Sequence, residues 1–176
     1  MKKLVIILVG LFLISSAFQQ KEDAAASNAK CKVIFLYNFT KMIKWPDEYN
    51  DGNFVIGVYG SYPPLITELN KMANVKTVGS QKFEIRTVTT LEAATKYHIL
   101  FVLNDKIGQF SEVTAKLKGK GTLLITEKDG MMKKGSMINF VVVDNKIKFE
   151  LSKANAEKQK LKIAHDLEAL AVKGND

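Results

Sequence analysis

The chain alternates short apolar runs with segments of helical periodicity, and this alternation limits the folds that it can adopt. The apolar runs span residues 54–60, 83–88, 97–103 and 122–126. The runs over 54–60 and 97–103 are almost continuously apolar, as expected of strands that are covered on both faces of a sheet. Helices are predicted between them over 63–73 and 106–117. Strands that alternate with helices predict a parallel sheet flanked by helices on both faces.

The pattern changes near the end of the chain. Residues 137–143 and 146–151 have strand character and are separated by the two-residue turn Asp144-Asn145, which predicts a β-hairpin. Ser152 is a predicted N-cap for a closing helical segment. The apolar stripe of that segment is Ile163, Ala164, Leu167, Leu170 and Ala171. The predicted fold class is therefore α/β, with a mostly parallel sheet and an antiparallel C-terminal edge hairpin.

The N-terminus has the features of a secretory signal. Lys2 and Lys3 precede an apolar run over 4–14, which is too short to cross a bilayer and is followed by small residues. We predict a cleavable signal peptide over 1–17, with a cut between residues 24 and 26 as the alternative. A polar, alanine-rich segment over 18–29 is predicted to be a disordered lead-in to a single domain over 30–173. The predicted location is the periplasm.

The first helix of this domain is predicted over 30–45, because Pro46 disfavours helical geometry at Trp45. Its predicted apolar arc contains Ile34, Trp45, Cys31, Met42, Phe35, Phe39, Ile43 and Leu36. Thr40, Lys41 and Lys44 fall on the opposite side. Tyr37 lies on the lysine side, so Tyr37 and Lys41 are candidates for contact with a partner or ligand.

Charge and cysteine content narrow the function classes. The formal net charge is +8 and becomes +6 without residues 1–17. The lysines are scattered and Arg86 is the only arginine. Because base readout depends heavily on arginine, no nucleic acid partner is expected. Cys31 is the only cysteine, so an intramolecular disulfide is excluded. It is interpreted as a buried small residue, with an intermolecular disulfide as the alternative.

No catalytic or metal-binding pattern is present in the sequence. His98 lies inside a predicted strand and is interpreted as a hydrogen-bonded core residue, while His165 precedes Glu168 on a helical face. Their positions relative to Cys31 lack metal-ligand spacing. Gly57 and Gly60 are interpreted as turn residues, because the two prolines at 63 and 64 remove the backbone donors that a phosphate would need. We expect no enzyme activity, no metal and no cofactor.

The second strand of the hairpin has two distinct faces. Its apolar residues alternate with Lys146, Lys148 and Glu150, which share the other face. This polar face is interpreted either as ordinary solvent-exposed surface or as a surface for a partner or ligand.

Four stretches together resemble the YfiR-like family of periplasmic proteins. They span residues 37–46, 54–60, 98–102 and 137–151, and the resemblance extends over about 30–172. It implies a non-enzymatic periplasmic regulator that binds and inhibits or modulates a membrane sensor protein, such as a diguanylate cyclase or a histidine kinase. It also implies a role in cyclic di-GMP signalling, a homodimer, and an outer-membrane lipoprotein as a further partner.

The resemblance also suggests which residues make these contacts. Lys148 and Glu150, with Lys146 behind them, are the candidates for partner or ligand binding, and Tyr37 is expected in a structural role together with Phe39 and Trp45. Two features depart from the family: the single Cys31 excludes redox switching by an intramolecular disulfide, and Lys148 stands where arginine is more common.

The alternative function is a periplasmic small-molecule-binding domain. The carboxyl ends of parallel strands form a crevice where the strand order reverses. In this chain, we expect that crevice near Gly60 and Asn104.

Overall fold

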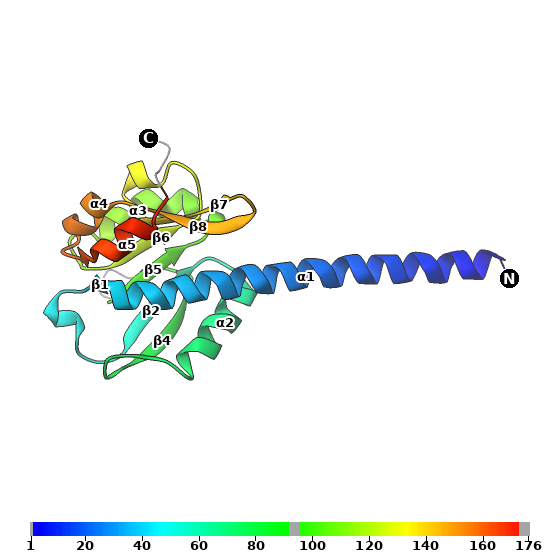
Figure 1. Ribbon diagram of the computed structural model, residues 1–176, viewed down its shortest axis with the longest axis horizontal. Helices are drawn as coiled ribbons and strands as arrows, with labels where there is room; N and C mark the ends of the chain where they lie inside the picture. The colour runs from blue at the N-terminus through cyan, green and yellow to red at the C-terminus, as the bar shows by residue number, and fades with distance from the viewer. Residues whose placement is uncertain (1, 92–95, 173–176) are drawn as a thin grey trace.

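A seven-stranded, mostly parallel sheet forms the centre of the protein (Figure 1). The computed structural model describes residues 2–91 and 96–172, with side chains from Glu22 onward. The strand order is β3-β4-β2-β5-β6-β7-β8. The parallel strands are β2 (Phe54–Tyr59), β4 (Gln81–Val88), β5 (Ile99–Val102), β6 (Leu123–Thr126) and β7 (Ile138–Val143). The antiparallel edges are β3 (Thr77–Val78) and β8 (Lys146–Leu151), so the predicted fold class and edge hairpin are confirmed.

The strand order reverses next to β2, which positions the candidate site. From β2 the chain crosses to β4 on one side, and it later continues through β5, β6 and β7 on the other. Every residue of β2, β5 and β6 is buried, in agreement with their continuous apolar sequences. The carboxyl ends of β2 and β5 therefore form a topological switch point.

Helices cover both faces of the sheet. α1 (Lys2–Met42) and α2 (Pro63–Ala73) pack against each other on one face (Figure 1). η2 (Asn104–Gln109) and α3 (Phe110–Lys116) connect β5 to β6. Right-handed connections that run in opposite directions along a sheet place their helices on opposite faces, so α3 lies opposite α2. The remaining helices are η1 (Asp47–Tyr49), η3 (Met132–Lys134), α4 (Lys153–Lys158) and α5 (His165–Leu170).

The buried face of α1 is rotated relative to the predicted arc. Its buried residues from position 33 onward are Val33, Leu36, Phe39 and Thr40. Val33 and Thr40 lie outside the predicted arc, whereas Ile34 lies on it and is 54% exposed. The Phe39 ring packs 5.1 Å from that of Phe149 and so orients this helix toward β8. Packing against the curled sheet, rather than the apolar pattern of the helix, thus determines which side is buried.

α1 ends at Met42, earlier than the predicted end at Trp45. Ile43–Lys44 instead form β1, which pairs antiparallel with β9 (Lys162–Ile163). The Trp45 indole Nε1–H donates a 3.0 Å hydrogen bond to the His98 carbonyl. The chain is therefore extended before Pro46.

The same pairing divides the predicted closing helical segment. Ser152 caps α4 as predicted, because its hydroxyl accepts a 3.3 Å bond from the Asn155 N–H. Lys160 then adopts a positive φ of 60°, β9 pairs with β1, and α5 follows. The expectation of one continuous helical segment was wrong, because strand pairing interrupts it.

Residues 18–29, predicted to be a disordered lead-in, are helical in the structure and belong to α1. This segment is rich in alanine, which has the highest helix propensity. Its end also contacts the domain, because Ala29 is fully buried and the Ala25 carbonyl accepts a hydrogen bond from Tyr62. The signal peptide over 1–17 stays a prediction. Among the residues that the structure describes, no helix is long and apolar enough to cross a membrane.

Candidate functional site: a cleft at the switch point

A cleft lies at the carboxyl ends of the parallel strands, where the sequence predicted a crevice. Tyr62, which follows β2, lines two neighbouring cavities of about 550 and 610 Å³. The first contains Asn104 and the second contains Gly60. The first cavity, called the cleft below, is also lined by side chains of α1, of the segment after β6, and of the β7–β8 hairpin.

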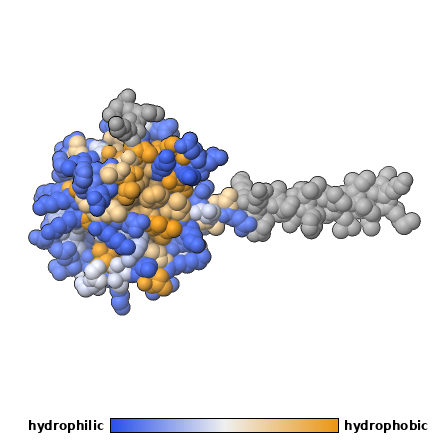
Figure 2. All heavy atoms as spheres, in the orientation of Figure 1, coloured by the Kyte–Doolittle hydropathy of each residue, from blue (hydrophilic) through white to orange (hydrophobic). Residues whose placement is uncertain are grey.

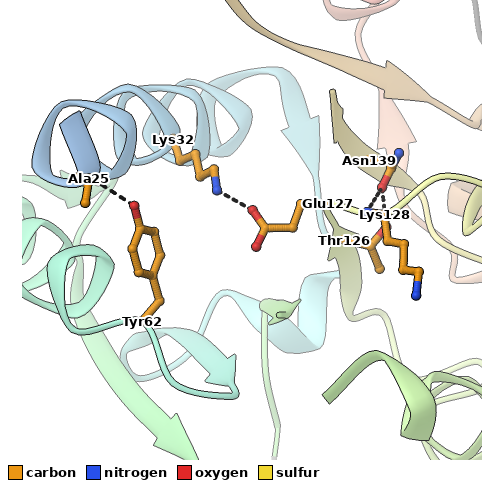
Figure 3. Close-up of polar contacts among 7 residues, drawn as sticks. All are labelled: Ala25, Lys32, Tyr62, Thr126, Glu127, Lys128 and Asn139. Carbon is orange, nitrogen blue, oxygen red and sulfur yellow. Dashed lines mark hydrogen bonds and ion pairs between the residues drawn. The ribbon is translucent and has the colours of Figure 1, made fainter. Parts of the chain in front are cut away.

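An ion pair joins α1 to the sheet inside this cleft. The Lys32 ammonium donates to the Glu127 carboxylate, and their side chains are only 13% and 17% exposed (Figure 3). The Lys32 Nζ also lies 5.3 Å from the ring centroid of Tyr62 and 5.9 Å from that of Phe101. Two aromatic rings and one carboxylate thus hold the ammonium in a largely dry position.

Tyr62 forms a second contact with α1. Its hydroxyl donates a 2.8 Å hydrogen bond to the Ala25 carbonyl (Figure 3). Burial raises the pKa of this phenol, and the negative charge of Glu127 raises it further. Tyr62 is therefore a neutral hydrogen-bond donor at neutral pH.

The glycine turn after β2 does not form a phosphate site. Gly60 has a φ of +125°, and a Cβ atom there would clash with Asp105 Oδ1 and lie 2.8 Å from Leu103 Cβ. The Asp105 carboxylate instead accepts a 3.2 Å bond from the Ser61 N–H. A carboxylate already occupies the position that an anion would need, so the interpretation of Gly60 as a turn residue is confirmed.

His98 is a structural residue of the core. It is 2% exposed, its Nδ1 accepts a 3.0 Å bond from the Val55 N–H, and its Nε2 lies 2.8 Å from the Tyr49 carbonyl. This arrangement requires the neutral ring with the proton on Nε2. Burial lowers the pKa of His98; the hydrogen bond to Tyr49 opposes this effect and the charge of Lys96 adds to it. The prediction of a hydrogen-bonded core histidine is confirmed.

Glu150, a predicted contact residue, belongs to a network inside the sheet. Its carboxylate accepts a 2.9 Å bond from Asn139 Nδ2. The Asn139 Oδ1 in turn accepts bonds from the Thr126 hydroxyl, at 2.8 Å, and from the Lys128 N–H, at 3.0 Å (Figure 3). Asn139 is fully buried. This network orients Glu150, and its role in partner binding stays a prediction.

The other predicted contact residues lie on two separate parts of the molecule. Lys146 is exposed and Lys148 half-buried on β8, at one edge of the sheet. Tyr37 packs 6.2 Å from Phe83 of β4, near the other edge, and the Lys41 Nζ lies 4.3 Å from the Tyr37 ring centroid. The structure brings Tyr37 and Lys41 together and leaves the β8 residues apart from them.

A mixed apolar and basic surface, which the sequence did not predict, lies between α1 and α2. Ile34 of α1 is 54% exposed and Val75, just after α2, is 74% exposed. Both line a shallow groove of about 290 Å³ that is bordered by Lys30, Lys76 and the ion pair of Lys71 with Glu68. We call this surface the α1–α2 face. Figure 2 shows apolar residues interleaved with hydrophilic ones on the side of the domain that bears α1.

Across residues 2–91 and 96–172, no group of three or more His, Cys, Asp or Glu side chains is placed to hold a metal ion. The most polar part of the cleft contains the Lys32–Glu127 pair and Asp129, together with asparagine side chains. Such groups can hydrogen-bond and pair with charges, which are the properties of a binding site.

The chain matches the model of a family described as YfiR/HmsC-like over residues 29–172. No curated protein matches the chain. The matched segment begins at the buried Ala29 of α1 and ends at Val172, whose N–H donates to the Phe149 carbonyl.

Proposed function

Because the chain belongs to the YfiR/HmsC-like family, we propose that it is a non-enzymatic periplasmic domain that binds and inhibits or modulates a membrane sensor protein. The family consists of periplasmic regulators, and the match over residues 29–172 is the observation that supports the proposal. The proposed sensor is a diguanylate cyclase or a histidine kinase with a periplasmic segment. A homodimer and an outer-membrane lipoprotein partner are further parts of the same proposal.

The α1–α2 face is the proposed contact surface for the sensor. Contiguous exposed apolar groups with a polar rim are typical of protein–protein interfaces. Ile34 and Val75 supply the apolar groups, and the rim carries Lys30 and Lys76 together with the Lys71–Glu68 ion pair, which leaves it with a net positive charge. A partner segment with apolar side chains flanked by acidic residues would complement this surface in both shape and charge. Tyr37 and Lys41 adjoin it, which is consistent with their predicted role.

A crosslinked pull-down from the native cell envelope tests the proposal. We expect mass spectrometry to recover a membrane protein that has a periplasmic sensor segment. The double variant Ile34→Glu, Val75→Glu should lose this protein, because it places charge on the apolar part of the face. Leu170→Glu is the matched control, since Leu170 is 61% exposed on α5, away from the face. If the wild-type protein and the Leu170→Glu control each recover only the chain itself and no membrane protein, the proposal is contradicted.

A small-molecule-binding domain is the second candidate function, and the cleft favours it. The cleft has a volume of about 550 Å³, within the usual range for ligand pockets, and contains a charged pair beside aromatic rings. A ligand that binds only the folded state raises the melting temperature by mass action. A thermal-shift screen of amino acids, nucleotides and anions is the test. Absence of any stabilisation by these compounds would count against a ligand in the cleft.

A further inference from the structure

We propose that the groove between α3 and α4 binds a small organic anion, either a carboxylate or a phosphate monoester with an apolar body. This groove has a volume of about 480 Å³. It is lined by residues from the start of β6 and β7, whereas the cleft lies where these strands end. The proposal is therefore independent of the proposed function.

The lining of the groove combines an apolar floor with positive charge. Leu124 and Met137 are buried at its base, and Lys118 and Lys158 stand at its rim. No aspartate or glutamate is among the described residues that line it. An uncompensated pair of ammonium groups beside apolar surface favours a ligand that has a negative charge and an apolar part.

Gln159 adds an unbonded donor to the groove, because no described residue accepts a hydrogen bond from its side-chain amide. The side chain is 6% exposed, and its buried Oε1 accepts no hydrogen bond. Gln159 lines the groove, and no described residue bonds to its Nε2, so this donor is available to a ligand there. Together with the Lys118 and Lys158 ammonium groups, it makes a cluster of three donor groups at the groove.

A glutamine at position 159 lowers the stability of the folded protein. A buried carbonyl oxygen without a hydrogen bond destabilises the folded state, and an apolar side chain of similar size would avoid this penalty. Residues that break such a local rule are expected mainly at functional sites. An amide whose donor faces a basic groove has a clear role there, since it can bond to an anionic oxygen.

One of the two lysines is held in place by a neighbouring hydrogen-bond network. The Lys158 Nζ lies 3.3 Å from Asn155 Oδ1. Asn155 Nδ2 donates to the carbonyls of Met132, at 2.9 Å, and Ser136, at 2.8 Å. Because Asn155 is fixed from η3, it orients the Lys158 ammonium at the rim of the groove.

Titration of the purified protein with defined probes tests the proposal. Benzoate and phenyl phosphate represent the two classes of anion, benzyl alcohol removes the charge, and inorganic phosphate removes the apolar body. NMR of the Gln159 side-chain amide reports binding at this site directly. We expect saturable shifts of this signal with benzoate or phenyl phosphate, at least tenfold weaker binding of inorganic phosphate, and no saturable shift with benzyl alcohol.

Substitutions separate binding from folding. Gln159→Met should raise the melting temperature by a few degrees and weaken anion binding about tenfold, two effects that a purely structural glutamine would not combine. Lys118→Met with Lys158→Met should also weaken binding by tenfold or more. Lys82→Met, at an exposed position of β4 away from the groove, is the matched control and should leave anion binding unchanged. An unshifted Gln159 amide, or unchanged binding in these groove variants, would overturn the proposal.

Discussion

The His98 cluster and the Lys32–Glu127 pair are both polar groups in a largely apolar protein, but they differ in how completely they are enclosed. His98 is 2% exposed, and both ring nitrogens are bonded to backbone atoms. The Lys32 and Glu127 side chains retain 13% and 17% exposure beside a cavity of about 550 Å³. The enclosed cluster stabilises the fold, whereas the pair in the cleft has room to exchange partners.

The largest effect is expected from removal of the enclosed histidine. His98→Leu leaves the Val55 N–H without its acceptor and removes ring contacts with Phe54 at 4.2 Å and Tyr49 at 4.9 Å. We expect a loss of about 3 kcal/mol in the free energy of unfolding, measured by urea denaturation. His165→Leu, at an exposed position, should change it by less than about 0.5 kcal/mol. Equal losses of stability in His98→Leu and His165→Leu would show that His98 does not stabilise the fold more than an exposed histidine does.

The Asn139 network should behave like the His98 cluster. Asn139→Leu leaves the Thr126 hydroxyl and the Lys128 N–H without their common acceptor. We expect a loss of about 2 kcal/mol in urea denaturation. Asn28→Leu, at an exposed position that lines the cleft, is the control and should have an effect within about 0.5 kcal/mol. If Asn139→Leu lowers the free energy of unfolding no more than Asn28→Leu does, this hydrogen-bond network does not stabilise the fold.

The stability of the protein should depend on pH through His98. Burial lowers the pKa of this residue in the folded state, so the unfolded chain binds a proton more readily. The stabilisation is complete above the ordinary histidine pKa of about 6.5 and is lost as pH falls toward the lower folded value. One proton corresponds to a slope of at most about 1.4 kcal/mol per pH unit.

Urea denaturation at a series of pH values between 7.5 and 5, roughly the range in which histidine titrates, measures this slope. His98→Gln should flatten it. A slope that persists in His98→Gln would assign the pH dependence to other groups.

A smaller effect is expected from the pair in the cleft. Lys32→Met should lower the free energy of unfolding by about 1 kcal/mol, because Glu127 keeps some access to water. Glu127→Leu and the double variant complete a double-mutant cycle in urea denaturation. We expect a coupling energy of about 1 kcal/mol. A coupling energy of several kcal/mol would show that the Lys32–Glu127 pair stabilises the fold as strongly as the His98 cluster does.

The sheet could be predicted from the sequence because its signal is local. The buried strands are continuous apolar runs, and Asp144 and Asn145 adopt the positive φ values of 53° and 57° that suit a two-residue hairpin turn. The α2 helix was predicted with its observed bounds because Pro63 marks its start. Such elements depend on neighbouring residues in the chain.

The orientation of α1 and the content of the cleft could not be predicted in this way. Apolar residues occupy more than half of the α1 circumference, so the exposure of Ile34 and the burial of Thr40 follow from contacts with the sheet. Lys32 and Glu127 are 95 residues apart, and neither belongs to a recognisable motif. The sequence did indicate the location of the cleft, because the carboxyl ends of parallel strands meet at one edge of a sheet and form a crevice there.

Site-specific photo-crosslinking in cells tests the central claim most directly. A photoreactive amino acid is placed at Val75 on the α1–α2 face or, as the matched control, at Leu170 on α5; these positions are 74% and 61% exposed. If the chain regulates a membrane sensor through this face, the probe at position 75 captures a protein with a periplasmic sensor segment and the probe at 170 does not. Capture at 170 alone, or of no membrane protein at either position, would contradict the account.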